Sequence, residues 1–232
     1  MTTAIILAGG MGTRLRSAVP DLPKPMAPID GRPFIEHQLD FWIGQGVDRF
    51  VLSVGYKKEV IMDHFGSSYR AVPLTYAIED KPLGTGGGLL LAAQGLSEPF
   101  LVLNGDTFFE VDLGELLKFH MDHSADWTFA LFQTREVGRY MGIEVKSDGE
   151  IGSLKSCTGE LDRLANGGVY LVNPSVLLNK EFVLGSKLSL EDDLLPALTA
   201  QGYKLFGLEF PGAFIDIGIP KDYFRATEVL PH

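Results

Sequence analysis

The sequence has little cysteine, no long apolar run and a deficit of basic residues. Cys157 is the only cysteine among 232 residues, which excludes an internal disulfide framework and a metal site built from a cysteine cluster. No apolar run approaches the length of about 18 residues that a membrane-spanning helix needs, and the run Ala4–Ala8 has no basic leader before it. The 20 basic and 30 acidic residues give a formal net charge of −10, which disfavours nucleic acids and anionic membranes as partners. We therefore expect a soluble, cytoplasmic protein.

The composition is that of a folded α/β protein. Hydrophobic residues make up 45% of the chain and charged residues 22%, as in globular domains. The length and the lack of a linker predict a single domain over residues 1–232. Short apolar runs alternate with helical patterns in the first half, which predicts a Rossmann-like, mostly parallel sheet with helices on both faces. The predicted strands are Ala4–Ala8, Phe50–Val54, Leu74–Ile78 and Phe100–Leu103, and helices are predicted from Pro33, over Lys58–Phe65 and over Gly84–Ala93.

The second half of the chain has a different pattern. Four apolar runs with short links predict a small antiparallel insertion, with a hairpin turn at residues 147–149. These runs are Trp127–Gln133, Gly142–Val145, Ile151–Lys155 and Gly168–Val172. After them we expect helices over Leu190–Ala200 and Pro220–Val229, and between these the strands Tyr203–Phe210 and Ala213–Ile217.

A glycine-rich turn follows the first predicted strand. The glycines of Gly9-Gly10-Met11-Gly12 would let backbone N–H groups approach a phosphate closely. The turn matches neither the dinucleotide fingerprint, which needs glycine at the position of Leu15, nor the P-loop, which needs Gly-Lys-Ser/Thr. It is therefore either a phosphate-binding turn of another kind or only a tight connection between strand and helix.

Four charged residues stand at places where a ligand could meet them. Arg14 follows the glycines, and Lys24 lies between two prolines that fix its backbone. Asp106 and Asp216 each come at the end of an apolar run, where open α/β sheets bind ligands. Two such acids could hold one Mg²⁺ together with phosphate oxygens, although each could also be an ordinary turn or capping residue.

Several motifs together resemble the sugar-1-phosphate nucleotidyltransferases. The motifs are Ala8–Leu15, Pro23–Pro28, Asn104-Gly-Asp106, Asn166-Gly-Gly168 and Asp216-Ile-Gly218, and their order matches over about residues 3–226. Within that family, the Val19–Pro28 stretch and the compact length most resemble the D-glycero-α-D-manno-heptose 1-phosphate guanylyltransferases. The resemblance implies the nucleotide-diphospho-sugar transferase type of fold, without the C-terminal β-helix of some relatives.

The resemblance also implies a reaction and roles for residues. A sugar 1-phosphate attacks the α-phosphorus of a nucleoside triphosphate in line, pyrophosphate leaves, and the products serve surface polysaccharide synthesis. Arg14, Lys24 and Lys155 would be catalytic, and Asp106 and Asp216 would hold Mg²⁺ as the cofactor. The implied nucleotide site comprises Leu7, Ala8, Gly9, Gly10, Gly12, Thr13, Glu79, Gly84 and Thr85, and the implied sugar site comprises Asn104, Asn166, Gly167 and Glu191. Family members commonly have an acid before the second lysine, but here Leu154 precedes Lys155.

Glu79 is the residue that bears on the choice of base. It stands where the thymidylyl enzymes of the family carry glutamine. A carboxylate can accept from both N1–H and the N2 amino group of guanine, so GTP is favoured, although Glu79 could also be a surface acid at a strand end. Glu191 has a rival interpretation too, since Ser189 before three acids is a typical helix N-cap.

Other functions remain open at this point. Rival enzymes would join GTP to mannose 1-phosphate or UTP to N-acetylmuramate 1-phosphate. A regulatory subunit that binds a sugar nucleotide without turnover, and a cytidylyltransferase for an alcohol such as phosphocholine, are rivals of other kinds. His120 and His123 are expected on the exposed face of a helix, and Cys157 is expected to be inert. The oligomeric state is not predicted.

Overall fold

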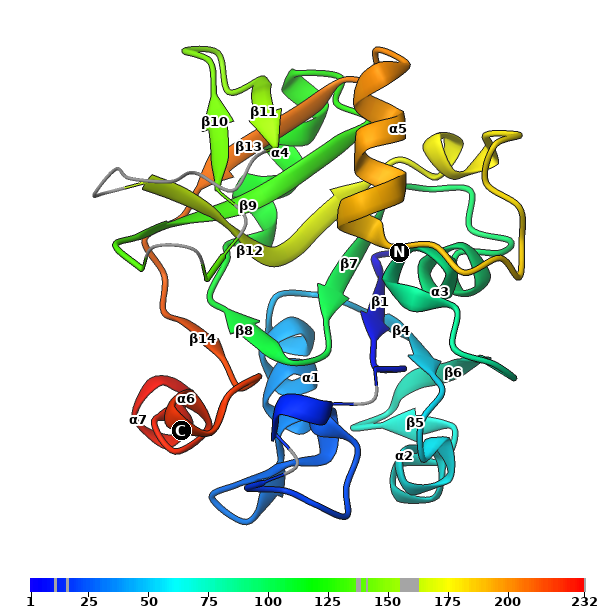
Figure 1. Ribbon diagram of the computed structural model, residues 1–232, viewed down its shortest axis with the longest axis vertical. Coiled ribbons are helices and arrows are strands. Elements are labelled where there is room, and N and C mark those ends of the chain that lie inside the picture. Colours follow the sequence, from blue (N-terminus) through cyan, green and yellow to red (C-terminus); the bar gives the residue numbers. More distant parts are fainter. Residues whose placement is uncertain (11, 16, 137–138, 141, 155–162, 232) are drawn as a thin grey trace.

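The centre of the molecule is an eight-stranded sheet (Figure 1). The computed structural model describes residues 1–10, 12–15, 17–136, 139–140, 142–154 and 163–231. In spatial order the strands of the sheet are β13 (Leu205–Glu209), β9 (Trp127–Thr134), β12 (Arg163–Val172), β7 (Phe100–Asn104), β1 (Thr3–Leu7), β4 (Arg49–Val54), β6 (Val72–Ile78) and β5 (Ser68–Tyr69). The four strands predicted in the first half of the chain are therefore neighbours in space.

Most of the strands run in one direction. β1 lies between β4 and β7 and is parallel to both, and β6 continues the parallel arrangement beside β4. β12 is antiparallel to both of its neighbours, β7 and β9. The short edge strand β5 is antiparallel to β6, whereas β13 is parallel to β9. The predicted mostly parallel sheet is confirmed.

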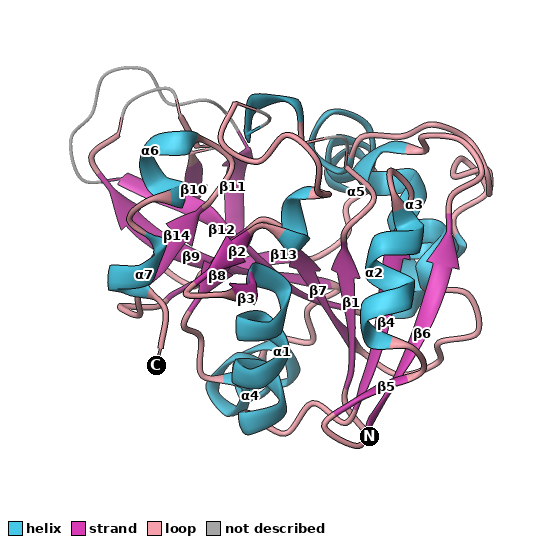
Figure 2. Ribbon diagram, turned by 90° about the horizontal axis from the view of Figure 1, so that it is seen from below, coloured by secondary structure: helices cyan, strands magenta, loops and turns pink. Residues whose placement is uncertain are grey.

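Helices cover both faces of the sheet (Figure 2). Ile6 of β1 packs in one core cluster with Leu39 and Leu116, whereas Ile5 packs in the opposite cluster with Leu89 and Leu198. Adjacent residues of a strand point to opposite faces, so this apolar run needs cover on both sides. The cover comes from α1 (Phe34–Gly44), α2 (Lys58–Phe65) and α4 (Leu113–Asp122) on one face and from α3 (Gly84–Ala92) and α5 (Leu195–Ala200) on the other.

The predicted antiparallel insertion is wrong in its extent. β9 and β12 belong to the main sheet, and the six residues Trp127–Phe132 are all buried, as expected for a strand that is covered on both faces. Only the hairpin of β10 (Ile143–Val145) and β11 (Ile151–Leu154) stands apart (Figure 1). Its turn includes Gly149 with a φ of 85°, at the predicted position.

Small elements complete the edge of the sheet where the strands end. β8 (Thr107–Phe109) pairs with β14 (Phe214–Asp216), and β2 (Pro28–Ile29) pairs with β3 (Arg32–Pro33). The helix predicted over Pro220–Val229 is instead two short helices, α6 (Pro220–Tyr223) and α7 (Ala226–Val229) (Figure 1). The remaining helical turns are η1 (Thr13–Leu15), η2 (Lys24–Met26), η3 (Pro174–Leu178) and η4 (Leu190–Leu194), the last of which is a π-helical turn that leads into α5.

The prediction for His120 is wrong. His120 is only 4% exposed, and its Nδ1 atom lies 2.8 Å from the Thr128 hydroxyl on β9. Burial lowers the pKa of His120 to about 4, so the ring is neutral near pH 7. His123 lies at the end of α4, partly exposed, with its ring against Phe119. Among the described residues, no helix is long and apolar enough to cross a membrane.

Candidate active site

A cavity of about 520 Å³ lies where β1, β4, β6 and β7 end. The carboxyl edge of a parallel sheet is the usual place for a ligand in this class of fold. Most of the residues predicted for the site line this cavity, although they come from segments far apart in the sequence. They are Leu7, Ala8, Gly9, Gly10, Gly12, Arg14, Lys24, Glu79, Gly84, Thr85, Asn104, Asp106 and Glu191.

The glycine-rich turn forms one wall of the cavity. Gly12 has a φ of 56°, a left-handed conformation that favours glycine. The Leu15 N–H donates to the Gly12 carbonyl at 3.1 Å and closes η1. Leu15 is buried while Arg14 is exposed and lines the cavity. The turn therefore presents an arginine and the backbone of Gly9 and Gly10 to the same space.

Lys24 and Asp106 form an ion pair at the cavity. Pro23 before Lys24 is extended and Pro25 after it is buried, but Lys24 itself begins the helical turn η2, so the extended backbone that the flanking prolines predict for Lys24 is wrong. The lysine side chain is 10% exposed and the aspartate side chain 31%. A cation from a loop and an anion from the end of β7 are thus held together beside the glycine-rich turn.

Asp216 is the last residue of β14 and lies close to Asp106. In the pairing of β14 with β8 it stands opposite Thr107, and the Ile217 N–H donates to the Asp106 carbonyl at 2.9 Å. One carboxylate oxygen of Asp216 accepts from the Gly218 N–H at 2.6 Å. Burial and the neighbouring Asp106 raise the pKa of Asp216, against the opposing effects of the Gly218 N–H, Lys24 and Arg139. The negative charge of Asp106 therefore disfavours the ionised form of Asp216, and a cation bound by both carboxylates would relieve this repulsion.

Glu79 is held in place between two glycines. Its Oε1 accepts from the Ser53 hydroxyl at 3.1 Å, and its Oε2 accepts from the Leu83 N–H at 2.9 Å. A Cβ on Gly9 would lie 2.3 Å from Oε1, and a Cβ on Gly88 would lie 2.9 Å from it. The glycines make room for the carboxylate, which faces the cavity with one lone pair left on each oxygen.

Thr85 and Glu191 connect the start of α3 to η4. The Thr85 hydroxyl donates to Glu191 Oε2 at 3.2 Å and accepts from the Leu190 N–H at 2.8 Å. Ser189 also caps this turn, because its hydroxyl accepts from the Asp192 N–H at 3.0 Å. The helix-cap interpretation of this segment is correct for Ser189, and Glu191 itself lines the cavity.

Two residues predicted for sugar binding lie away from this cavity. Asn166 donates to the Tyr170 hydroxyl at 2.7 Å and accepts from the Gly168 N–H at 3.0 Å. A Cβ on Gly167 would lie 2.3 Å from the Phe109 ring, and Gly168 has a φ of 72°. The register of β12 shifts at this point. The Asn-Gly-Gly motif thus shapes a bulge in β12 and brings Gly168 against Asn104.

Sequence reasoning missed several residues near the site. Gln38, which is 2% exposed, donates from Nε2 to the Asn104 carbonyl at 2.8 Å and to the Thr107 carbonyl at 2.5 Å. It therefore holds both ends of the turn that carries Asp106. Its place on the inner face of α1 was predictable, but its partners come from 66 and 69 residues away. Further lining residues that were missed are Pro25, Ser53, Pro82, Gly88, Gly105 and Lys187.

Three of the residues for which predictions were made are not described in full. Lys155 and Cys157 lie outside the described residues, and Thr13 belongs to η1 without a described side chain. Among the described residues there is no group of three or more His, Cys, Asp or Glu side chains placed to hold a metal ion. A metal at Asp106 and Asp216 would therefore take its other ligands from a bound substrate or from water.

The chain is similar to known nucleotidyltransferases over nearly its whole length. It is 41% identical to the D-glycero-α-D-manno-heptose 1-phosphate guanylyltransferase of Aneurinibacillus thermoaerophilus, over 99% of this chain and 98% of the relative. The protein of the same name from Campylobacter jejuni is 37% identical, over 96% of this chain and 97% of the relative.

A solved structure is similar as well. The structure of HddC from Yersinia pseudotuberculosis complexed with GMP-PN superposes with a TM-score of 0.85 at 32% identity, over 98% of this chain and 99% of that one. Residues 3–231 match the family described as nucleotidyl transferase. The resemblance inferred from the motifs is therefore confirmed, and the chain belongs to the nucleotidyl transferase family.

Proposed function

We propose that the protein transfers GMP from GTP to a sugar 1-phosphate, for which D-glycero-α-D-manno-heptose 1-phosphate is the best candidate. The products would be GDP-heptose and pyrophosphate. The single observation that carries the proposal is that the Lys24–Asp106 ion pair, Arg14 and Glu79 all border one cavity at the end of the parallel strands. The names of the two relatives and the GMP-PN complex of HddC support the choice of guanine and heptose.

The residues divide the work of an in-line displacement at the α-phosphorus. The backbone of Gly9 and Gly10 and the charge of Arg14 would bind the triphosphate and the leaving pyrophosphate. Lys24 would donate to the phosphate oxygens at the reacting centre, where negative charge builds up in the transition state. The reaction needs no protein nucleophile, because the sugar phosphate oxygen itself attacks as the bond to pyrophosphate breaks.

A divalent cation, Mg²⁺, is part of the proposal. Asp106 and Asp216 fit it, because the hydrogen bond from the Ile217 N–H to the Asp106 carbonyl brings two carboxylates close together. Burial and the charge of Asp106 raise the pKa of Asp216, so a cation there would be favourable. When bound there, the cation would neutralise phosphate charge and help to align the triphosphate. Lys24 would then exchange its contact with Asp106 for a phosphate oxygen of the substrate.

Glu79 would read the base. Its carboxylate is fixed by Ser53 and Leu83 and keeps one lone pair free on each oxygen. Guanine offers two neighbouring donors, N1–H and the N2 amino group, to such a carboxylate, whereas uracil offers one ring N–H. The contacts with the sugar phosphate stay predictions. The residues predicted for them are Asn104, Asn166, Gly167, Glu191 and Lys155. The cytoplasmic location is also part of the proposal, since a nucleoside triphosphate is an intracellular metabolite.

Pyrophosphate release with GTP and a panel of acceptors tests the proposed acceptor. The panel consists of heptose 1-phosphate, mannose 1-phosphate, N-acetylmuramate 1-phosphate and phosphocholine. The heptose 1-phosphate should give the highest kcat/KM. If another acceptor gives a higher kcat/KM, that acceptor replaces the heptose 1-phosphate as the proposed substrate. If the protein binds the nucleotide but releases no pyrophosphate with any acceptor, a regulatory subunit is favoured.

A further inference from the structure

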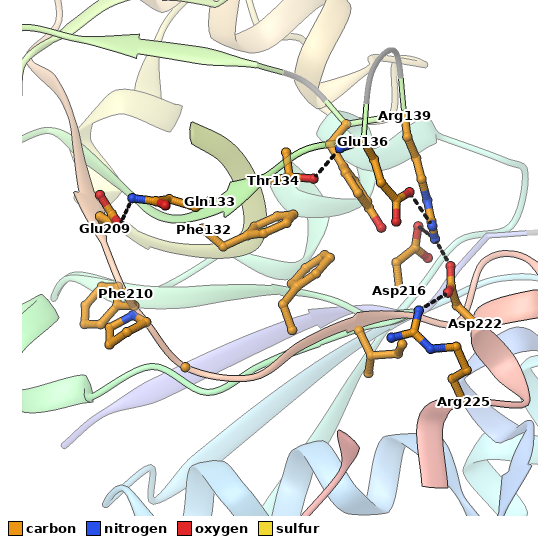
Figure 3. A pocket seen from close by; sticks show the side chains of 15 residues that line it. Phe132, Gln133, Thr134, Glu136, Arg139, Glu209, Phe210, Asp216, Asp222 and Arg225 are labelled. Carbon is orange, nitrogen blue, oxygen red and sulfur yellow. Dashed lines mark hydrogen bonds and ion pairs between the residues drawn. The ribbon is translucent and has the colours of Figure 1, made fainter. Parts of the chain in front are cut away.

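Asp216 is not among the residues that line the cavity described above; it borders a second cavity, of about 490 Å³ (Figure 3). The rings of Phe132 and Phe214 stack at 3.9 Å in its wall. At one end of this cavity Arg139, Asp222 and Arg225 come together next to Asp216 (Figure 3). This charged cluster comes from segments that the sequence motifs did not single out.

The cluster is centred on a buried carboxylate. Asp222 in α6 is 2% exposed, and one of its oxygens is ion-paired with Nη2 of Arg139. Its other oxygen accepts from Nη1 of Arg225 at 3.1 Å. Arg139 also donates from Nη1 to Glu136 at 2.8 Å. A buried carboxylate needs such partners, and the position of the Arg139 guanidinium is in turn set by Asp222.

Arg139 forms a long ion pair with Asp216 but no hydrogen bond. Its Nη2 atom is 3.7 Å from Oδ2 of Asp216, whose other oxygen accepts from the Gly218 N–H. The Asp216 side chain is 15% exposed. Among the described residues Oδ2 is thus the oxygen of Asp216 that accepts no hydrogen bond, and the Arg139 guanidinium lies within ion-pair distance of it.

We propose that Asp222 is a positioning residue that keeps Arg139 at 3.7 Å from Oδ2 of Asp216, out of hydrogen-bond contact, and so leaves this oxygen open to a divalent cation. The inference rests on the metal site of the proposed function. Without the charge of Asp222, attraction would draw the partly buried Arg139 onto Asp216. The cation would then have to displace a guanidinium before it could bind.

The test measures the metal-dependent gain in nucleotide affinity rather than turnover. Calorimetry gives the Kd of a guanine nucleotide analogue that cannot release pyrophosphate, once without and once with Mn²⁺. The readout is the Kd without Mn²⁺ divided by the Kd with Mn²⁺, so a larger ratio means a larger gain in affinity from the metal. In Asp222→Asn this ratio should fall by about threefold to tenfold, as expected for an ion pair that competes with the metal. Circular dichroism should show that the variant is folded.

Three further variants separate competition from general damage. Arg225→Met removes the partner of Asp222 that does not face Asp216, so the ratio should stay at the wild-type value. Arg139→Met should raise the ratio, because the guanidinium that lies 3.7 Å from Oδ2 and competes with the cation is gone. The double variant Asp222→Asn with Arg139→Met should recover what Asp222→Asn loses, whereas a purely structural role predicts a further loss.

The ratios measured in these variants either support or overturn the positioning role of Asp222. An unchanged ratio in folded Asp222→Asn, or an unchanged or lower ratio in Arg139→Met, would overturn the positioning role while leaving the metal site intact. If Asp222→Asn does not fold, Arg139→Met decides: a raised ratio supports the positioning role, and an unchanged or lower ratio overturns it. A wild-type ratio of one would mean that no cation joins the nucleotide at Asp216, and both the metal site and the role of Asp222 would then be wrong.

Discussion

The Lys24 ammonium and the Asp106 carboxylate, 82 residues apart in the chain, form an ion pair beside the glycine-rich turn. Lys24 is held by flanking prolines, and Asp106 by the end of β7. Without substrate, each charge thus has a partner and costs little to keep partly buried. Substrate phosphates and a cation can replace the two partners, so the pair is a preorganised site for anionic ligands.

Removing the lysine charge should impair the reaction much more than it impairs folding. Lys24→Met should lower kcat/KM for GTP by about a hundredfold, the usual cost of losing one charged donor at a reacting phosphate. Steady-state pyrophosphate release measures this value. The matched control is Lys118→Met, which breaks an exposed ion pair with Asp122 on α4 and should leave kcat/KM within about twofold of wild type. An equal loss in both variants would contradict a special role for Lys24.

Glu79 should determine the preference for guanine. In Glu79→Gln the Leu83 N–H still needs an acceptor, so the amide nitrogen takes the place of the oxygen that faces the Ser53 hydroxyl, which can accept from it. One acceptor for guanine is then lost. We expect kcat/KM for GTP to fall by about tenfold to a hundredfold, with a smaller change for UTP. Parallel assays with the two triphosphates check this. Equal losses for both would mean that Glu79 supports the cavity without reading the base.

Gln38 should act on the reaction through the turn that carries Asp106. Gln38→Leu leaves the Asn104 and Thr107 carbonyls without their buried donor, which should cost about 1 to 3 kcal/mol of unfolding free energy. It should also lower kcat by about tenfold with little change in KM, because Asp106 loses its fixed position.

The control for Gln38 is Gln45→Leu. Gln45 accepts from the Leu113 N–H at the start of α4, away from the cavity. This variant should lose stability without losing kcat. Denaturant unfolding and steady-state kinetics on both variants make the comparison, and a parallel loss of kcat in Gln45→Leu would show that stability alone is responsible.

His120 should make the fold sensitive to acid. Its pKa is lowered by burial to about 4 in the folded protein, against about 6.5 in the unfolded chain. The unfolded state therefore binds the proton more readily than the folded state. The neutral, buried His120 makes its full contribution to the free energy of unfolding above about pH 6.5, and this contribution is lost as the pH falls towards 4. The loss should reach about 3 kcal/mol at pH 4.

Denaturant unfolding between pH 7 and pH 4 measures this dependence. His120→Gln removes the titrating group and keeps a polar partner for Thr128. The variant should lose less stability on acidification than the wild type does. Equal slopes for the two proteins would assign the acid sensitivity to other groups.

Much of the fold could be predicted from local patterns. The apolar runs at β1, β4 and β7 predicted strands, and their alternation with helices predicted a parallel sheet. The pattern does not show that β9 and β12 belong to the main sheet. A short connection between two apolar runs is equally compatible with a hairpin of neighbouring strands and with two strands of a larger sheet. For His120 the pattern was available, since it follows Leu113 and Leu116 at helical spacing on the buried face of α4.

The site, like the fold, contains residues that local patterns predict and residues that they do not. Glycines and charges at strand ends marked the cavity, because strand ends meet at one edge of a parallel sheet. Gln38 and Asp222 could not be recognised, because their roles depend on partners that only the folded chain brings to them. No local residue pattern records a hydrogen bond across 66 residues.

Competition among four nucleoside triphosphates shows which nucleotide the protein transfers to the heptose 1-phosphate. The protein is incubated with heptose 1-phosphate, Mg²⁺ and equal concentrations of GTP, UTP, CTP and dTTP, and the nucleotide sugars are identified by mass spectrometry. We expect GDP-heptose as the main product of the wild-type protein, and almost no GDP-heptose with Lys24→Met. A different nucleotide sugar as the main product, or no nucleotide sugar from the wild-type protein, would contradict the proposed function.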